Sequence, residues 1–118
     1  MSKLTTARIL SIVALTLSVG ASASVAAAGQ DDAVKKGEQV YAAQKCQTCH
    51  SIAGKGNKAN PLDGVGAKLS ADDIRQWILN APEMAAKAKA ERKPPMKPFT
   101  LPKDELDDLV AYLQSLKK

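Results

Sequence analysis

The sequence predicts a single all-α domain of about four helices joined by long irregular loops. Apolar residues recur at helical spacing near the C-terminus, and no stretch alternates apolar and polar residues as a half-buried strand does. Two internal stretches are too rich in glycine or proline to continue a helix. The chain has 118 residues, which is the usual length of one domain.

The N-terminal segment has the composition of a secretory signal. Its only charges are Lys3 and Arg8, and an apolar run of eleven residues extends from Ile9 to Val19. A basic start, a short hydrophobic stretch and a small-residue tail ending at Ala28 are the three regions of such a signal. We therefore expect the chain to be cleaved near Ala28, which removes this N-terminal segment.

Cleavage there separates a signal peptide, residues 1–28, from a domain of residues 29–118 in an oxidising compartment, which we expect to be the periplasm. The alternative is an uncleaved anchor, because residues 9–28 carry no charge over about the 20 residues that a membrane helix needs. Alanine, serine and glycine in the second half of this stretch drive insertion only weakly. Contact with a membrane is expected only through such an uncleaved signal.

The composition excludes several classes of protein. Removal of the signal reduces the formal net charge from +5 to +3, the lysines are scattered and no nucleic-acid motif is present, so nucleic acid is not an expected partner. Two cysteines and one histidine are too few for a multi-disulfide scaffold or for a zinc site with four Cys or His ligands. Four aromatic residues leave the core short of large side chains, which suggests that another group fills its centre.

The first predicted helix extends from Asp31 to Gln44, with Asp31 or Asp32 as its N-cap. Gly37 lies inside it, and glycine costs about 1 kcal/mol there relative to alanine, so close approach of another helix would explain its presence. The following residues 51–68 contain four glycines and one proline and predict an irregular loop without strand or helix.

The second predicted helix begins at Ser70, and Asp73 three residues later approximates a capping box. Pro82 ends or kinks this helix, and the Ala- and Lys-rich residues 83–92 predict another short one. Four prolines within residues 93–102 then predict a stiff extended loop.

The last predicted helix follows Pro102 and has the most regular pattern in the chain. Asp104 and Glu105 lie in its first turn, and Lys117 and Lys118 lie at its end, as the helix dipole favours. Its apolar residues repeat at helical spacing: Leu106, Leu109, Val110, Leu113 and Leu116.

Both cysteines and the only histidine lie in one pentapeptide, Cys46-Gln47-Thr48-Cys49-His50. C-x-x-C-H is a haem-attachment pattern: each thiol forms a thioether with one vinyl group, and the adjacent imidazole binds the iron. A thioredoxin-like pair would need a strand before the motif and a helix after it, whereas here a predicted helix precedes the motif and a glycine-rich loop follows it. We therefore expect one covalent haem c per chain, bound through Cys46 and Cys49, with His50 as an iron ligand.

With this motif, the chain resembles class I cytochromes c, small monohaem carriers that include bacterial periplasmic c-type cytochromes, over most of residues 31–116. Gly37 and Tyr41 are similar to the family's Gly-x-x-x-aromatic pair on the first helix, which meets an aromatic residue on the last helix, here near Tyr112. The resemblance implies a cytochrome c-like fold wrapped around haem, and an electron carrier rather than an enzyme. It also implies redox partner proteins, and we expect a monomer.

The resemblance further implies a proline whose carbonyl accepts the N–H of the ligand histidine. Pro61, followed by Leu62 and Gly64, is similar to that proline, although Asn60 stands where the family usually has glycine. Such a bond would orient the imidazole ring and raise its basicity.

The sixth iron ligand is implied by the same resemblance. Met96 begins the sequence Met-Lys-Pro-Phe, which resembles the family's Met-x-Pro-Phe loop before the final helix. A thioether ligand favours the reduced metal. Ordinary packing is then the preferred role of Met84. Met84 as the ligand, a lysine ligand and an open site are the remaining alternatives.

Trp77 has two interpretations, as a core residue beside Ile74 and Ile78 or as a haem contact that hydrogen-bonds a propionate, and core packing is preferred. Scattered lysines are either an ordinary solvated surface or a ring around the haem edge that steers an acidic partner. They are Lys45, Lys55, Lys58, Lys68, Lys87, Lys89, Lys93 and Lys97.

The sequence thus predicts a periplasmic one-electron carrier whose iron cycles between Fe(II) and Fe(III). One alternative is a haem sensor or small-gas-binding module in which Met96 dissociates, and another is a haem subunit of a larger oxidoreductase. A peroxidase-like enzyme is disfavoured because no second histidine is present.

Overall fold

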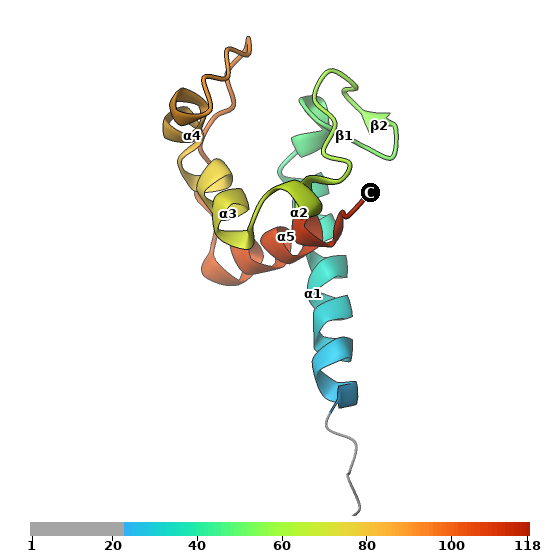
Figure 1. The fold of residues 1–118 in the computed structure, drawn as a ribbon. Helices are drawn as coiled ribbons and strands as arrows, with labels where there is room; N and C mark the ends of the chain where they lie inside the picture. The colour runs from blue at the N-terminus through green and yellow to red at the C-terminus, as the bar shows by residue number, and fades with distance from the viewer. Residues whose placement is uncertain (1–22) are drawn as a thin grey trace, which may run out of the picture.

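The structure is a computed structural model that describes residues 23–118 (Figure 1), so most of the predicted signal peptide lies outside the described residues. The elements, in chain order, are α1 (Ala23–Ala43), the 3-10 turn η1 (Cys46–Thr48), β1 (Ser51–Ile52), β2 (Lys55–Gly56), α2 (Val65–Lys68), α3 (Ala71–Leu79), α4 (Ala81–Lys87) and α5 (Lys103–Ser115). Helices dominate, and the predicted all-α class is confirmed.

Helix α1 begins earlier than predicted. It starts at Ala23, eight residues before Asp31, and therefore runs across the predicted cleavage site after Ala28. Alanine has the highest helix propensity, so the alanine-rich stretch continues the helix and Asp31 is not its cap. Figure 1 shows this first part of α1 projecting away from the other helices, and residues 28–32 are exposed.

Helices α1 and α5 pack closely at Gly37. A Cβ atom there would collide with the backbone carbonyl of Asp108 and would lie 2.6 Å from the Tyr112 Cβ atom. One turn along α1, the Tyr41 and Tyr112 rings meet edge to face with centroids 5.8 Å apart. The close helix approach that Gly37 suggested is therefore confirmed.

The hydrophobic core forms where α3 and α5 meet the end of α1. Its buried residues are Tyr41, Ile74, Ile78, Leu106, Leu109, Val110 and Leu113. An ion pair between Arg75 and Asp107, with 2.7 Å between nitrogen and oxygen, also links α3 to α5. No large side chain among the described residues is less than 2% exposed, so protein atoms alone build a thin core.

The segment after the cysteine motif is more ordered than predicted. Residues 51–56 form a hairpin in which Ser51 pairs with Gly56 and Ile52 with Lys55, and α2 follows it. The turn holds Ala53 and Gly54, whose φ angles are 51° and 75°. Two positive φ angles favour a two-residue hairpin turn, so the prediction of a loop without strand or helix is wrong here.

The predicted start of α3 is confirmed. The Asp73 amide donates to Ser70 Oγ at 3.1 Å, and the Asp73 carboxylate accepts from the Ser70 amide, which completes the capping box. Pro82 lies in the first turn of α4 as expected, but this helix ends at Lys87 rather than Arg92. The left-handed φ of 50° at Lys89 stops its continuation.

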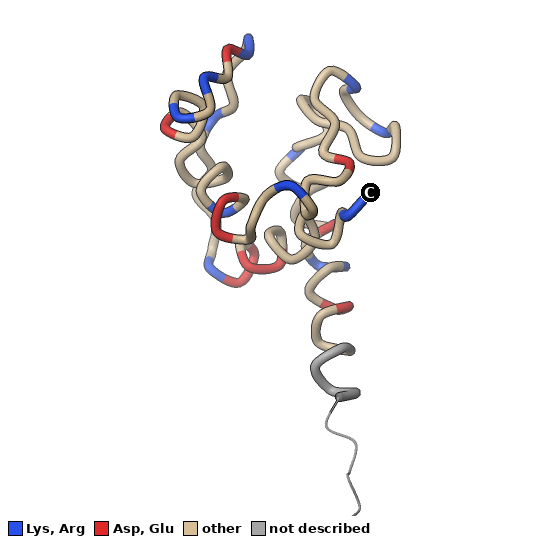
Figure 2. The backbone as a smooth tube through the Cα atoms, in the orientation of Figure 1, with Lys and Arg blue, Asp and Glu red and all other residues tan. Residues whose placement is uncertain are grey.

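Residues 93–102 contain neither helix nor strand, and α5 follows them, both as predicted. The end of α5 differs from the prediction: the helix stops at Ser115 because the Leu116 backbone (φ −77°, ψ 84°) leaves the helical range, so its last turn contains no lysine. Figure 2 shows acidic residues gathered at the starts of α3 and α5, and basic residues spread along both of two arms. One arm consists of α3, α4 and the loop of residues 88–102, and the other of η1 and the β1–β2 hairpin (Figure 1). Among the described residues, no helix has the length and hydropathy that crossing a membrane requires.

Candidate functional site

The cysteine motif is wound into a tight turn directly after α1. Lys45 adopts a left-handed conformation (φ 56°, ψ 35°), and the amides of Cys49 and His50 both donate to the Cys46 carbonyl, at 3.1 and 2.9 Å. Both thiols are free; Cys46 is half-buried against the core, and Cys49 is exposed. The turn therefore presents two thiols and one imidazole on a single short segment.

The imidazole of His50 is oriented by the backbone of the next loop. Its Nδ1 lies 3.1 Å from the Asn60 carbonyl oxygen, and because a carbonyl only accepts, Nδ1 carries the proton. The unprotonated Nε2 is then free to bind a metal.

The acceptor for His50 differs from the sequence prediction. The resemblance implies the carbonyl of Pro61, but the acceptor is the carbonyl of Asn60, and Pro61 is exposed. Backbone pairing places the Asn60 carbonyl, rather than that of Pro61, beside the histidine. The Ser51 amide also donates to the Asn60 carbonyl at 3.2 Å, and the Leu62 amide donates to the Ser51 carbonyl at 2.8 Å. A backbone acceptor does not depend on its side chain, so the proline was an unreliable marker.

Burial favours the metal-binding form of His50. Removal from water lowers the pKa of the imidazole, and the hydrogen bond to Asn60 opposes this only in part. A neutral imidazole is the form that binds metals. Burial also raises the pKa of the Cys46 thiol to about 11, so this group is protonated at neutral pH.

Two asparagines that the sequence did not single out bind the same turn. Asn57 Nδ2 donates to the Thr48 carbonyl at 3.3 Å, and Asn60 Nδ2 donates to the Cys49 carbonyl at 3.2 Å. The Asn57 backbone amide lies 3.0 Å from the His50 carbonyl. The presence of amide side chains in the loop directly after the motif is the sequence feature that could have indicated these contacts. Their partners are backbone atoms, which the sequence does not specify.

The loop that carries Met96 belongs to the opposite arm (Figure 1). Met96 is half-buried between exposed neighbours, and the loop is attached to α3 by a hydrogen bond from the Phe99 amide to the Ile78 carbonyl at 2.8 Å. Met84 on α4 is also half-buried. Burial alone therefore does not show which methionine is the better candidate for the iron ligand. The two differ in location, because Met84 lies on a helix and Met96 lies on a loop that is attached to α3.

Trp77 lies on the same arm. It is half-buried and is not one of the side chains packed against the core cluster, although Ile74 and Ile78 of the same helix are. The preferred interpretation of Trp77 as a core residue is therefore wrong, and its role as a haem contact stays a prediction.

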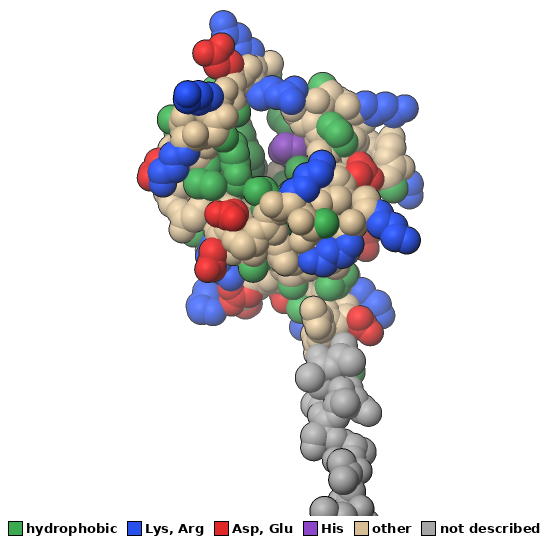
Figure 3. Space-filling view, viewed as in Figure 1, with side chains coloured by type: hydrophobic (Ala, Val, Ile, Leu, Met, Phe, Trp, Pro, Cys, Tyr) green, Lys and Arg blue, Asp and Glu red, His purple; other side chains and the backbone are tan. Residues whose placement is uncertain are grey.

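A hollow separates the two arms, and the histidine is visible inside it (Figure 3). Hydrophobic side chains cover the wall on the α3–α4 side, and basic side chains surround the opening. A hollow with an apolar wall on one side, and a turn that carries a free imidazole nitrogen and two free thiols on the other, fits a covalently bound haem, whose flat ring needs apolar contacts and whose iron needs an oriented ligand.

The comparisons with known proteins agree with this site. Residues 34–117 match the family model described as Cytochrome c. The chain is similar to cytochrome c-555 of Methylococcus capsulatus strain Bath, with 31% identity over 114 residues that cover 95% of this chain and 85% of that protein. No solved structure gives a significant match.

These matches include the haem-attachment turn and both helices that cross at Gly37. The family carries covalently attached haem c with iron, as the motif predicted, and its members transfer electrons. The chain therefore belongs to the cytochrome c family and is a haem-based electron carrier.

Proposed function

We propose that the protein is a periplasmic one-electron carrier whose haem iron is held by His50 and Met96. The observation that carries this proposal is the hydrogen bond from His50 Nδ1 to Asn60, because it leaves Nε2 as the only free ring nitrogen. The position of the Met96 loop on the other arm supports a ligand from the opposite side of the hollow.

Each protein residue at such a site has a separate role. Haem supplies a one-electron iron couple when it is bound. Cys46 and Cys49 hold it in one orientation, and the Asn60 carbonyl keeps the His50 ring aligned. Met96 would complete the ligand set, which would exclude oxygen and other small molecules. Cys49 is exposed, so the thioether that it would form lies on the side from which electrons would enter and leave.

Absorbance spectroscopy with two methionine variants tests the ligand set. We expect the oxidised protein to show the near-infrared charge-transfer band of a Met–Fe(III) bond. Met96→Ala should abolish this band because the thioether is lost, whereas Met84→Ala, the matched control at another half-buried methionine, should retain it.

Other results would favour other functions. Loss of the band in Met84→Ala alone would move the ligand to α4. An absent band in the wild type, together with a large spectral change when carbon monoxide is added to the reduced protein, would favour the haem sensor or gas-binding module.

The protein also needs redox partner proteins, and the basic side chains around the opening of the hollow would steer acidic ones (Figure 3). We propose that it acts as a free monomer rather than as a subunit of a larger oxidoreductase. Co-purification of other chains with the native protein would contradict the free monomer.

Export is proposed from the signal-like N-terminus. Cleavage after Ala28 would remove the first six residues of α1. The helix that would remain is exposed from residue 29 to 32, and its packed contact at Gly37 lies further along, so cleavage after Ala28 would keep that contact. The intact mass of the protein from a periplasmic extract tests this, and a mass that includes the first 28 residues would favour the uncleaved anchor.

A further inference from the structure

We infer that Arg92 is a positioning residue that acts as a clasp across the open end of the hollow. It ties the loop that carries Met96 to the loop that orients His50, and it thereby slows release of Met96 from the iron. The inference rests on the proposed His50 and Met96 ligands and adds a device that controls how firmly the second one is held.

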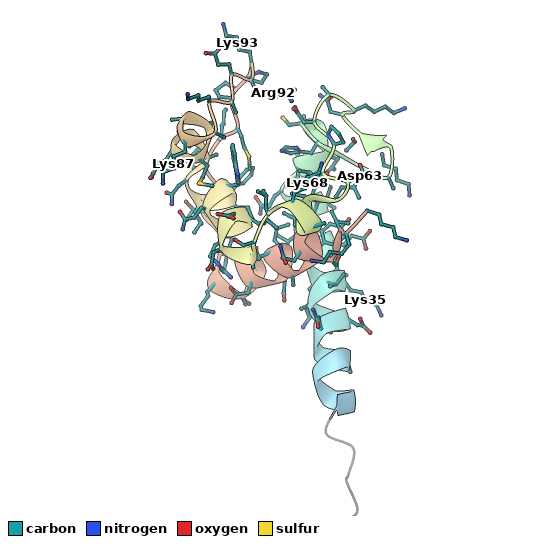
Figure 4. The ribbon with its side chains drawn as sticks, in the orientation of Figure 1. Lys35, Asp63, Lys68, Lys87, Arg92 and Lys93 are labelled. Carbon is teal, nitrogen blue, oxygen red and sulfur yellow. The ribbon has the colours of Figure 1, made fainter. Side chains whose placement is uncertain are left out.

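The contact joins the two arms directly. Arg92 Nη1 donates to the Ala59 carbonyl oxygen at 3.3 Å, across 33 positions of the sequence. Figure 4 shows Arg92 at the end of the α3–α4 arm, facing the other arm across the hollow. A bond between the ends of the arms resists their separation.

The acceptor of this bond is well anchored. The Ala59 amide donates to Asn57 Oδ1 at 3.0 Å. The Asn60 amide, which shares a peptide group with the Ala59 carbonyl, donates to the Asn57 carbonyl at 3.4 Å. Asn57 and Asn60, on either side of Ala59, donate through their amides to the Thr48 and Cys49 carbonyls of the haem-attachment turn. The clasp thus connects to the segment that carries His50 rather than to an isolated surface loop.

The donor is linked to Met96 by a stiff segment. Only four positions separate Arg92 from Met96, and Pro94 and Pro95 lie between them. Proline fixes φ, so restraint of Arg92 limits the movement of the methionine. The other side of Met96 is restrained by the hydrogen bond from the Phe99 amide to the Ile78 carbonyl. These two attachments limit how far the loop backbone can move when the methionine side chain rotates away, and so favour its return to the iron.

The charge of arginine strengthens the bond, because a hydrogen bond from an ionised donor exceeds one between neutral groups. Among the described residues, Arg92 forms no ion pair, so its guanidinium is not committed to a carboxylate. Its neighbour Lys93 is also exposed and forms no hydrogen bond or ion pair in the part of the chain that the structure describes. The two residues are a matched pair in charge and position.

Displacement of Met96 by added imidazole measures the clasp. In the oxidised protein at saturating imidazole, the rate at which the Met–Fe(III) band disappears equals the rate of methionine release. We compare the wild type with Arg92→Ala and Lys93→Ala by stopped-flow absorbance. The reduced low-spin spectrum of each variant verifies that the haem site is intact.

We expect Arg92→Ala to release methionine about three to ten times faster, as loss of one exposed charged hydrogen bond predicts, and Lys93→Ala to stay within about twofold of the wild type. Equal rates in all three proteins would overturn the clasp while leaving the proposed ligands intact. Equal acceleration in both variants would also overturn it, because loss of charge alone would then be the cause. A wild type without the Met band would refute the proposed ligands and the clasp together.

Discussion

At the residue scale, the site depends on backbone carbonyls as much as on side chains. His50 is oriented by the Asn60 carbonyl, and Arg92 donates to the carbonyl of Ala59 one position earlier. The asparagine side chains around them bind further carbonyls of the attachment turn. Substitution of Ala59 therefore keeps the acceptor for Arg92, whereas substitution of Asn60 keeps the acceptor for His50 but removes its side-chain bond to the Cys49 carbonyl.

Tyr41 is the buried residue with an unsatisfied polar group. It is 8% exposed, and its hydroxyl has no hydrogen-bond partner among the described residues. Burial is the main cause that raises the pKa of this phenol to about 12, and the nearby Cys46, Tyr112 and Asp63 contribute less. A buried hydroxyl without a partner destabilises the fold.

We expect Tyr41→Phe to leave the free energy of unfolding at neutral pH unchanged or to raise it by up to about 1 kcal/mol, because the ring stays and the unpaired hydroxyl goes. In the wild type the unfolded phenol ionises near pH 10, whereas the folded one needs about pH 12. The free energy of unfolding of the wild type should therefore fall as the pH rises from about 10 to about 12. That of Tyr41→Phe should fall less over the same range.

Denaturant titrations of the haem-loaded proteins at neutral pH and above pH 10 measure this effect. Tyr112→Phe is the control for loss of a hydroxyl at a half-buried ring. A loss of more than about 1 kcal/mol in Tyr41→Phe at neutral pH would mean that the hydroxyl has a partner in the haem-loaded protein.

At the scale of elements, the crossing of α1 and α5 organises the domain. Gly37→Ala puts a methyl group against the Asp108 carbonyl, where the backbone has no room. We expect a loss of about 1 to 3 kcal/mol in unfolding free energy from overpacking, although alanine is the better helix former. The same change at Gly29, which also lies in α1 but has no neighbouring atom within 4 Å, should leave stability unchanged or raise it by up to about 1 kcal/mol. Denaturant unfolding of both haem-loaded variants tests this, and equal stabilities would contradict a tight crossing.

At the scale of the whole molecule, the protein core is too small to hold the arms together by itself. The buried hydrophobic side chains gather where α1, α3 and α5 meet, and the two arms beyond them enclose the hollow. We expect the haem-free double variant Cys46→Ala, Cys49→Ala to be largely unfolded, because the walls of the hollow would face water. A well-dispersed NMR spectrum of that variant would refute this, and the haem-loaded wild type is its folded control.

The sequence by itself determined the parts of the protein that depend on local signals. The capping box at Ser70, the prolines around Met96 and the leucine spacing of α5 act over a few residues, and the structure has each of them where predicted. The haem-attachment motif is also local, because thioether spacing and the adjacent imidazole need only five consecutive residues.

Tertiary structure alone decided which groups meet across the hollow. The choice of Asn60 over Pro61 follows from backbone pairing with Ser51 and Leu62, and the Arg92 contact joins loops 33 positions apart. The hairpin after the motif depends on two left-handed residues, only one of which is a glycine. Backbone amides and carbonyls are the same in every residue except proline, so the sequence carries little record of which ones will bond; the packed chain selects them by bringing them within reach.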